Sequence, residues 1–207
     1  METGNIKTTD FSIVEEFEKK IAEFFGAPFA VAVDSCTHAI EICLRFNESK
    51  DITCPNRTYL SIPMLASKLN IPLYWRYFEW ENYYCLTTEP NPIIDAAVYW
   101  KKDGYISNTL MCISFQYQKH LSLGRGGVIL CSTKEQYDKL KKMSYDGRLP
   151  NTPWREQNID MIGYHYYMTP ETAKLGLEKL EQAISTKPKQ WVYTDWPDLT
   201  QMDIFKK

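Results

Sequence analysis

The sequence predicts an α/β protein with a three-layer α/β/α arrangement and a mostly parallel central sheet. Short apolar runs rich in β-formers, such as Phe29 to Val33, alternate with segments whose apolar residues recur at helical spacing, such as Ile13 to Phe25. Each parallel strand connection must cross a face of the sheet, so this alternation favours parallel strands covered by helices. The 207 residues, 44% of them hydrophobic, suffice for one sizeable core.

The first part of the chain starts with a helix over Ile13 to Phe25, which Gly26-Ala27-Pro28 stops. A strand over Phe29 to Val33 follows, and polar Asp34-Ser35 separates it from a helix over Thr37 to Phe46. The same alternation of periods then predicts a strand at 51–54, a helix at 58–69, and strands at 73–77 and 92–96.

The same reading predicts two further strands, at 111–115 and 128–131. A helix is predicted over 134–145, and residues 148–158 have the composition of an exposed loop. Thr169-Pro170 then opens a helix that runs to Ile184. The tail after this helix is polar but carries several aromatic residues.

Charge and composition exclude some classes of partner and site. The net charge is −2 and the basic residues are dispersed, so neither a nucleic acid nor an anionic membrane is an expected partner. The six cysteines form no C-x-x-C pair and indicate reduced, buried thiols, with no metal site. Without a leader-like amino terminus or a membrane-length apolar segment, we expect a soluble, cytoplasmic protein.

One lysine stands between a buried strand and a glycine-rich turn, in SFQYQKHLSLGRGG, residues 114–127. Burial would lower the pKa of Lys119 and free its amine as a nucleophile. The alternative is a solvated surface lysine, the commoner environment for this residue type.

This segment is similar to the Schiff-base motif of the DegT/DnrJ/EryC1/StrS sugar aminotransferases, which are fold-type I enzymes dependent on pyridoxal phosphate. The resemblance implies that Lys119 binds the cofactor aldehyde. It also implies that Ser114 donates its hydroxyl to the cofactor phosphate, although a serine at a strand end can instead satisfy local backbone groups.

Residues 92–97, PIIDAA, resemble the I-x-D-A-A motif of the same family. The resemblance implies that Asp95 pairs with the pyridine nitrogen and keeps it protonated, so that the ring can withdraw electrons. A turn or helix-cap aspartate is the alternative.

Residues 31–40, VAVDSCTHAI, resemble the family's S-G-T-x-A-L turn, which implies that Ser35, Cys36 and Thr37 hold the cofactor phosphate. An anion suits a helix amino terminus because free N–H groups and the helix dipole point at it. A plain Ser/Thr cap is the alternative, and Cys36 stands where the family usually has glycine.

Residues 51–59 are similar to the family's V-x-x-P-x-x-T-aromatic segment, which implies that Tyr59 stacks on the pyridine ring. A tyrosine that packs in the core at a helix start is the alternative.

Residues 163–168, GYHYYM, resemble the family's G-x-N-x-R-M segment but depart from it at two positions. His165 replaces an asparagine that reaches the cofactor phosphate of the neighbouring subunit, and the resemblance implies that the His165 segment faces that phosphate. Tyr167 replaces an arginine on the substrate side. Val98 is a third departure, because the family commonly has a polar residue there.

The resemblance implies an aminotransferase that uses pyridoxal phosphate to aminate a nucleotide-linked keto-sugar with a donor such as glutamate. It also implies a homodimer whose subunits share the active site. Residues 1–185 would form the large domain, and residues 186–207 would be a tail, the remnant of a small domain. Trp191 and Trp196 could stack on a sugar or nucleotide, but we expect them to anchor this tail.

The departures leave a second hypothesis open, a reduced relative that keeps the fold for binding or assembly without catalysis. A dehydratase is disfavoured, because relatives with that activity have histidine in place of the lysine.

Overall fold

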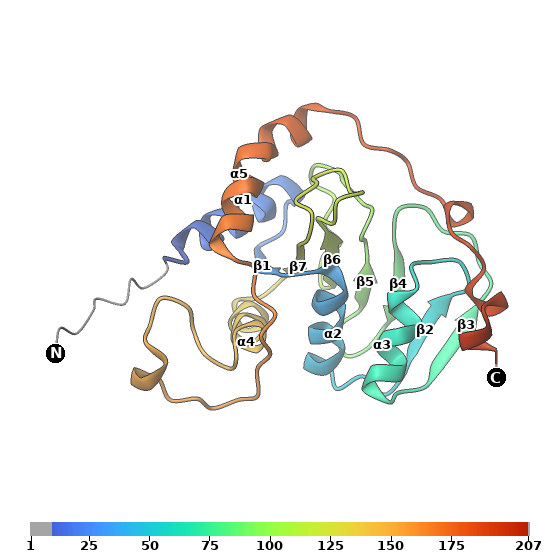
Figure 1. Ribbon diagram of the computed structural model, residues 1–207, viewed down its shortest axis with the longest axis horizontal. Coiled ribbons are helices and arrows are strands. Elements are labelled where there is room, and N and C mark those ends of the chain that lie inside the picture. Colours follow the sequence, from blue (N-terminus) through green and yellow to red (C-terminus); the bar gives the residue numbers. More distant parts are fainter. Residues whose placement is uncertain (1–9, 207) are drawn as a thin grey trace.

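A five-stranded mixed sheet with strand order β1-β7-β6-β5-β4 forms the centre of the computed structural model, which describes residues 10–206 (Figure 1). Its strands are β1 (Phe29–Val33), β4 (Tyr84–Thr87), β5 (Ile93–Asp95), β6 (Leu110–Ser114) and β7 (Gly127–Cys131). A two-stranded sheet, β2 (Ile52–Pro55) with β3 (Leu73–Arg76), lies beside β4. The amino-terminal residues on which the expected lack of a leader rests fall outside the described range.

The strand directions correct the prediction of a mostly parallel sheet. β5 pairs with β6 in parallel, as β2 does with β3, but β7 is antiparallel to both β1 and β6, and β4 is antiparallel to β5. Residues 88–92 and 115–126, which join the antiparallel neighbours β4–β5 and β6–β7, contain no helix. A parallel pairing needs a crossover that these connections do not provide.

Helices cover both faces of the sheet, which confirms the α/β class and the three layers. Helices α1 (Ser12–Phe25) and α5 (Pro170–Ser185) share one hydrophobic cluster with the sheet. Helices α2 (Cys36–Phe46), α3 (Ser61–Leu69) and α4 (Lys134–Ser144) share the other (Figure 1). No helix in the described part of the chain is long and apolar enough to cross a bilayer.

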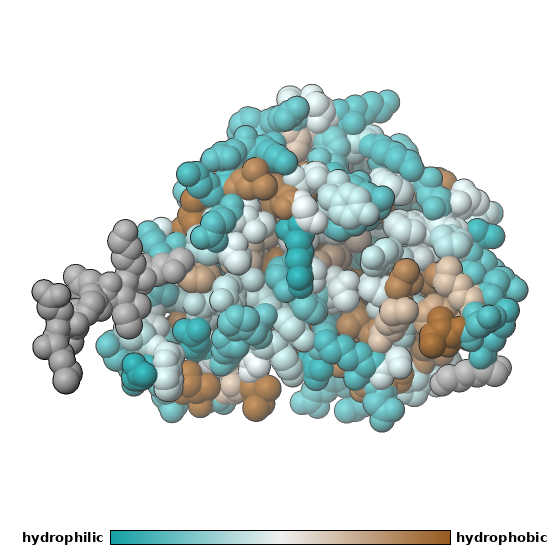
Figure 2. Space-filling view, viewed as in Figure 1, coloured by the Kyte–Doolittle hydropathy of each residue, from teal (hydrophilic) through white to brown (hydrophobic). Residues whose placement is uncertain are grey.

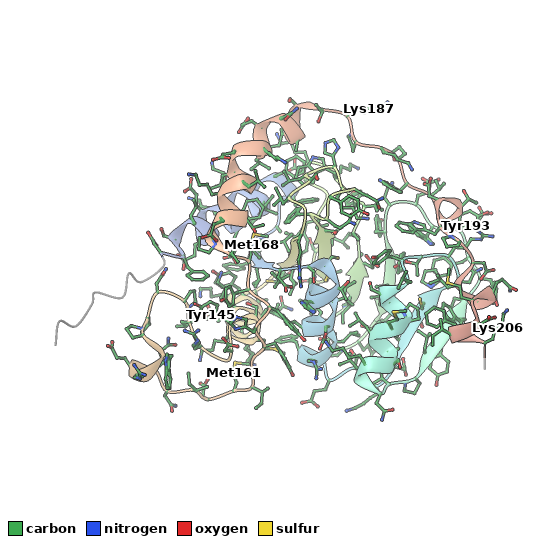
Figure 3. The ribbon with its side chains drawn as sticks, in the orientation of Figure 1. Tyr145, Met161, Met168, Lys187, Tyr193 and Lys206 are labelled. Carbon is green, nitrogen blue, oxygen red and sulfur yellow. The ribbon has the colours of Figure 1, made fainter. Side chains whose placement is uncertain are left out.

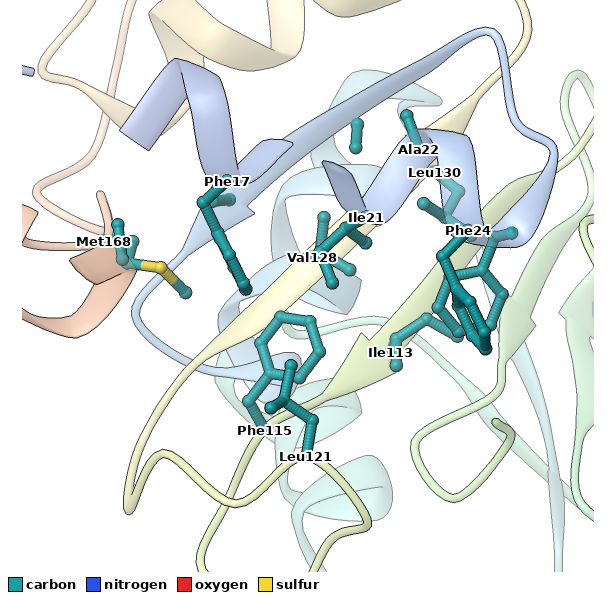
Figure 4. Packing of buried hydrophobic residues seen from close by; sticks show 14 of the residues in the cluster. Phe17, Ile21, Ala22, Phe24, Ile113, Phe115, Leu121, Val128, Leu130 and Met168 are labelled. Atoms are coloured by element: carbon teal, nitrogen blue, oxygen red, sulfur yellow. The ribbon is translucent and has the colours of Figure 1, made fainter. Parts of the chain in front are cut away.

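Strand β1 is apolar along its whole length because both of its faces are buried. In β1, Ala30 and Ala32 belong to the α1/α5 cluster, whereas Val31 and Val33 belong to the α2 cluster. Figure 4 shows the first cluster, in which Phe17 of α1 lies against the sheet. The same ring meets Phe115 edge to face at 5.5 Å between centroids.

A buried ion pair joins the helices of the two faces at the edge of the sheet. Glu18 of α1 accepts from the Lys141 ammonium of α4 at 2.5 Å and from the backbone N–H of Ala32 at 2.7 Å. Both charged side chains are buried. Such a pair is costly to break, since removal of one partner strands the other charge in the core.

The helices and strands named from the sequence are present, with ends shifted by a few residues. Strand β4 is an additional element, which hydropathy did not indicate. The loop at 148–158 contains a 3₁₀ turn, Trp154–Glu156, and the tail contains the turns Tyr193–Asp195, Leu199–Gln201 and Asp203–Phe205.

Close packing of α1 on α5 generates a stability prediction. A Cβ atom on Gly176 of α5 would lie 2.5 Å from Cε2 of Phe17. We expect Gly176→Ala to lower the free energy of unfolding by roughly 1–3 kcal/mol through overpacking, despite the better helix propensity of alanine. Urea unfolding measures it, with the exposed Lys174→Ala on the same helix as control. Equal stability of the two variants would contradict the packing.

Candidate active site

The carboxyl ends of several strands open into one cavity of ≈ 220 Å³. Strands β1, β2, β5 and β6 end at this edge, and the antiparallel strands β4 and β7 begin there. Ligands of α/β sheets bind at this edge because the loops that follow the strands converge on it. All the site residues predicted from the sequence line this cavity except His165: Ser35, Cys36, Thr37, Tyr59, Asp95, Ser114 and Lys119.

Asp95 is the last residue of β5 and is 5% exposed. Its carboxylate accepts a hydrogen bond from the Tyr84 hydroxyl and another from the backbone N–H of Ala97, at 3.1 Å. Tyr84 pairs with Asp95 across β4 and β5, and its hydroxyl also contacts the Thr58 hydroxyl. A chain of three buried polar side chains therefore holds the carboxylate in place.

Burial raises the pKa of Asp95, because an ionised carboxylate is poorly solvated there. The Tyr84 hydroxyl, the Ala97 amide and the positive charge of Lys119 act in the opposite direction. A carboxylate in this position gains stability from any cation or protonated nitrogen that enters the cavity.

Lys119 lies in the loop between β6 and β7, and the loop's own contacts fix its backbone. Its amide donates to the Gln116 carbonyl at 2.8 Å. Leu121 and Leu123 of the same loop are buried in the α1/α5 cluster. The loop therefore presents Lys119 from a rigid base.

Burial also lowers the pKa of Lys119, and the neighbouring Cys36 and Asp95 offset this only in part. The direction is the one that a nucleophilic amine requires, since only the neutral form attacks a carbonyl. The solvated surface lysine considered as the alternative is not what the structure shows.

The amino terminus of α2 forms the wall of the cavity that is suited to an anion. Ser35 caps the helix by accepting from the N–H of His38 at 3.2 Å. The helix begins at Cys36, and Thr37 bonds to Ser61 at 3.1 Å between hydroxyl oxygens. A Cβ atom on Gly127 would lie 2.5 Å from the Cys36 nitrogen, so only glycine lets β7 pass this close to the helix terminus.

Ser114 and Tyr59 border the same cavity from other strands. Ser114, at the end of β6, is buried and accepts from the N–H of Gln116 at 3.3 Å, which leaves its own hydroxyl proton for another acceptor. Tyr59 follows β2, is 50% exposed, and meets Trp196 edge to face at 6.1 Å between centroids.

The three departures from the family pattern lie in different places. Val98 lines the cavity and gives it an apolar wall. His165 is exposed outside the cavity and pairs with Asp146 at 3.0 Å. Tyr167 packs against Phe11 and Tyr145 and does not line the cavity.

Some cavity residues carry no local signal in the sequence. Tyr84 sits in a run of aromatic and polar residues, and only its pairing with β5 brings it to Asp95. Trp196 comes from the tail and reaches the cavity through tertiary contacts alone. Arg125 lines the mouth and bonds to the Asp34 carboxylate at 2.7 Å.

Comparison with known families gives one match over most of the chain. The profile of the DegT/DnrJ/EryC1/StrS aminotransferase family matches residues 1–71 and 96–193. The unmatched segment between them carries β3, β4 and β5, so Asp95 itself lies just outside the matched range. No curated protein matches the chain in sequence.

Solved structures with a similar fold come from several bacteria. The pyridoxal phosphate form of Spr1654 from Streptococcus pneumoniae has a TM-score of 0.70 at 17% identity, over 86% of this chain and 61% of that one. AtS13 from Actinomadura melliaura gives 0.68 at 17% identity, over 85% and 61%. Helicobacter pylori PseC, an aminotransferase of pseudoaminic acid biosynthesis, gives 0.63 at 16%, over 83% and 58%. The chain thus spans about three fifths of these proteins.

The buried Asp95 generates a stability prediction with a defined pH dependence. A carboxyl whose pKa is higher in the folded protein destabilises the fold as it ionises. This cost is absent below its unfolded pKa and complete above its folded pKa. We expect Asp95→Asn to raise the thermal midpoint of the cofactor-free protein by a few degrees at about pH 7.5, and by less at about pH 4.

Scanning calorimetry at both pH values measures this, with Asp51→Asn, an exposed aspartate, as control. A variant that is less stable than the wild type at neutral pH would contradict the cost assigned to Asp95.

Proposed function

The chain belongs to the DegT/DnrJ/EryC1/StrS aminotransferase family, and from this premise we propose that it is a pyridoxal phosphate-dependent sugar aminotransferase with Lys119 as its attachment lysine. The observation that carries the proposal is the meeting of Lys119 and Asp95 in one cavity, beside the amino terminus of α2. We propose a nucleotide-linked keto-sugar as the acceptor and an amino acid such as glutamate as the donor.

The cavity contains the groups that this cofactor needs. Lys119 offers an amine for the aldehyde, and Asp95 offers a buried carboxylate for the ring nitrogen. The amides at the start of α2 and the hydroxyl of Ser114 suit the phosphate, with Ser35, Cys36 and Thr37 along its wall. Tyr59 would cover one face of the ring. When bound, the cofactor supplies an electron-withdrawing ring that stabilises negative charge on the substrate carbon.

Two side chains would control protons in the proposed reaction. Asp95, fixed by Tyr84 and Ala97, would hold a proton on the ring nitrogen and so keep the ring electron-poor. Lys119 would take a proton from the donor carbon and return it at the neighbouring position, and its lowered pKa increases the share of neutral amine available for this step. The apolar wall formed by Ile40, Ile62 and Val98 limits the entry of water.

The homodimer is also a proposal, supported by the position of His165. Its ring lies outside its own cavity and is exposed, so it is free to meet the phosphate end of a partner's site. A cytoplasmic location and a division into a large domain, 1–185, and a tail, 186–207, stay predictions.

A non-catalytic role is a second candidate, and two observations favour it. Val98 replaces a polar group in the cavity wall, and Tyr167 packs away from the cavity where relatives have a substrate-side arginine. A protein that keeps the cofactor site but lacks substrate contacts would bind the cofactor without turnover.

The visible spectrum separates these candidates. We expect the wild type, mixed with pyridoxal phosphate, to develop an absorbance band that Lys119→Ala lacks, because Lys119 is the one lysine among residues 10–206 that lines the cavity. Adding glutamate should bleach the band within minutes if the protein is an aminotransferase. Asp95→Asn should keep the band but lose bleaching by at least about 100-fold in rate, since the ring nitrogen loses its proton.

Two outcomes count against the proposal in different ways. A wild type without the band would exclude the cofactor itself. A band that no amino donor bleaches, with a keto-sugar present, would favour the non-catalytic candidate.

A further inference from the structure

The carboxyl-terminal residues 186–206, here called the strap, run from the end of α5 to the side of β3. Figure 3 marks this path with Lys187, Tyr193 and Lys206, and Figure 1 shows it in red. The strap contains only short 3₁₀ turns and extended residues, so it holds little structure of its own. Its position is set by its contacts with the rest of the protein.

Hydrogen bonds attach the strap to two segments of the rest of the protein, residues 80–82 and residues 56–57. At the first segment, Asn82 donates to the Trp191 carbonyl at 2.9 Å and Tyr193 donates to the Trp80 carbonyl at 3.0 Å. At the second, Leu199 donates to the Asn56 carbonyl at 2.8 Å, and the Arg57 guanidinium donates to the Trp196 carbonyl at 2.8 Å. The strap is therefore held at both places, and Trp196, which lies between them in sequence, lines the cavity.

Two indole rings of the strap lie against the ammonium of Lys119. Its nitrogen is 5.5 Å from the centroid of the Trp191 ring and 5.4 Å from that of Trp196. The two rings are 5.8 Å apart and stacked at 24°. The nitrogen and the two centroids thus form a nearly equilateral triangle, so both rings share the cation.

The indoles are the principal partners of this ammonium. Among residues 10–206, no carboxylate lies within ion-pairing distance of it and no acceptor within hydrogen-bonding distance. The Trp196 indole N–H also has no hydrogen-bond partner among these residues, so the polar atom of that ring does not explain its position. The faces of the two indole rings make the contact with the Lys119 ammonium.

We propose that Trp191 and Trp196 are positioning residues, which form an aromatic clamp that holds the amine of Lys119 at the cavity mouth until a ligand takes it. This inference deepens the proposed function, because the clamped amine is the proposed attachment group. Aromatic faces stabilise a cation but cannot accept its proton or bind it in one fixed direction. The clamp therefore holds the lysine without the strong ion pair that would keep it from reacting.

Other titratable groups near Lys119 act alongside the clamp. Within the strap, the Lys189 ammonium lies over Trp191, one of the two clamp rings, at 3.7 Å from the ring centroid. The same ammonium pairs with Asp195 at 3.0 Å. The titratable side chains that line the cavity with Lys119 are Cys36 of α2, Tyr59 after β2, Tyr84 of β4, Asp95 of β5 and Arg125 before β7. None of these residues is substituted in the experiment below, although Trp191→Leu also removes the ring beneath Lys189.

Competitive labelling of lysines with trace acetic anhydride, read by peptide mass spectrometry across a pH series, tests the clamp without any cofactor. The double variant Trp191→Leu/Trp196→Leu keeps apolar cover but removes the ring faces, so less of Lys119 stays protonated. We expect its titration midpoint to fall and labelling below that midpoint to rise about fivefold. The double phenylalanine variant should restore the wild-type midpoint in large part.

The chain provides its own controls. Trp154→Leu removes an exposed tryptophan outside the cavity and should leave the Lys119 midpoint unchanged. Lys141, paired with Glu18 in the core, should stay unlabelled in every folded variant. If Lys141 becomes labelled in the double variant, that variant is not folded, and the single variant Trp196→Leu is then compared with the wild type.

An unchanged or higher midpoint for Lys119 in a folded leucine variant would overturn the clamp. That result would leave the proposed cofactor chemistry intact, because the labelling needs no cofactor. A missing absorbance band in the wild type would instead contradict the proposed function and leave the midpoint shift unaffected.

Discussion

Burial of two ionisable groups in one cavity is the constraint on which the rest of the site depends. Water solvates neither the Asp95 carboxylate nor the Lys119 ammonium well, so the pKa of the acid rises and that of the amine falls. They make no direct ion pair, and each is compensated separately. Tyr84 and the Ala97 amide stabilise the carboxylate, and two indoles stabilise the ammonium. Both groups thus stay available to a ligand that enters between them.

The mixed sheet places these compensating groups where they are needed. Because β4 runs antiparallel to β5, its first residue, Tyr84, lies opposite Asp95. Because β7 runs antiparallel to β6, it starts at the same edge, and Gly127 passes under the α2 terminus. The space-filling view shows a mostly hydrophilic face with apolar residues in small groups (Figure 2).

Local patterns in the sequence predicted the elements and the cavity residues that follow them. Helical spacing identified α1, α2 and α5, and apolar runs identified β1, β6 and β7, because each signal lies within one element. Strand direction, β4 and the Tyr84 contact depend on pairing between distant segments, which periodicity does not report. The anchoring predicted for Trp191 and Trp196 agrees with their backbone contacts, but their position over Lys119 follows only from the path of the strap.

Capture of the cofactor aldehyde by the amine of Lys119 is the step on which the proposed function depends. Borohydride reduction of the protein after mixing with pyridoxal phosphate, followed by peptide mass spectrometry, tests it most directly, because reduction makes the bond permanent. We expect one phosphopyridoxyl group on the peptide that contains Lys119. Label spread over exposed lysines such as Lys174, with none on Lys119, would contradict it.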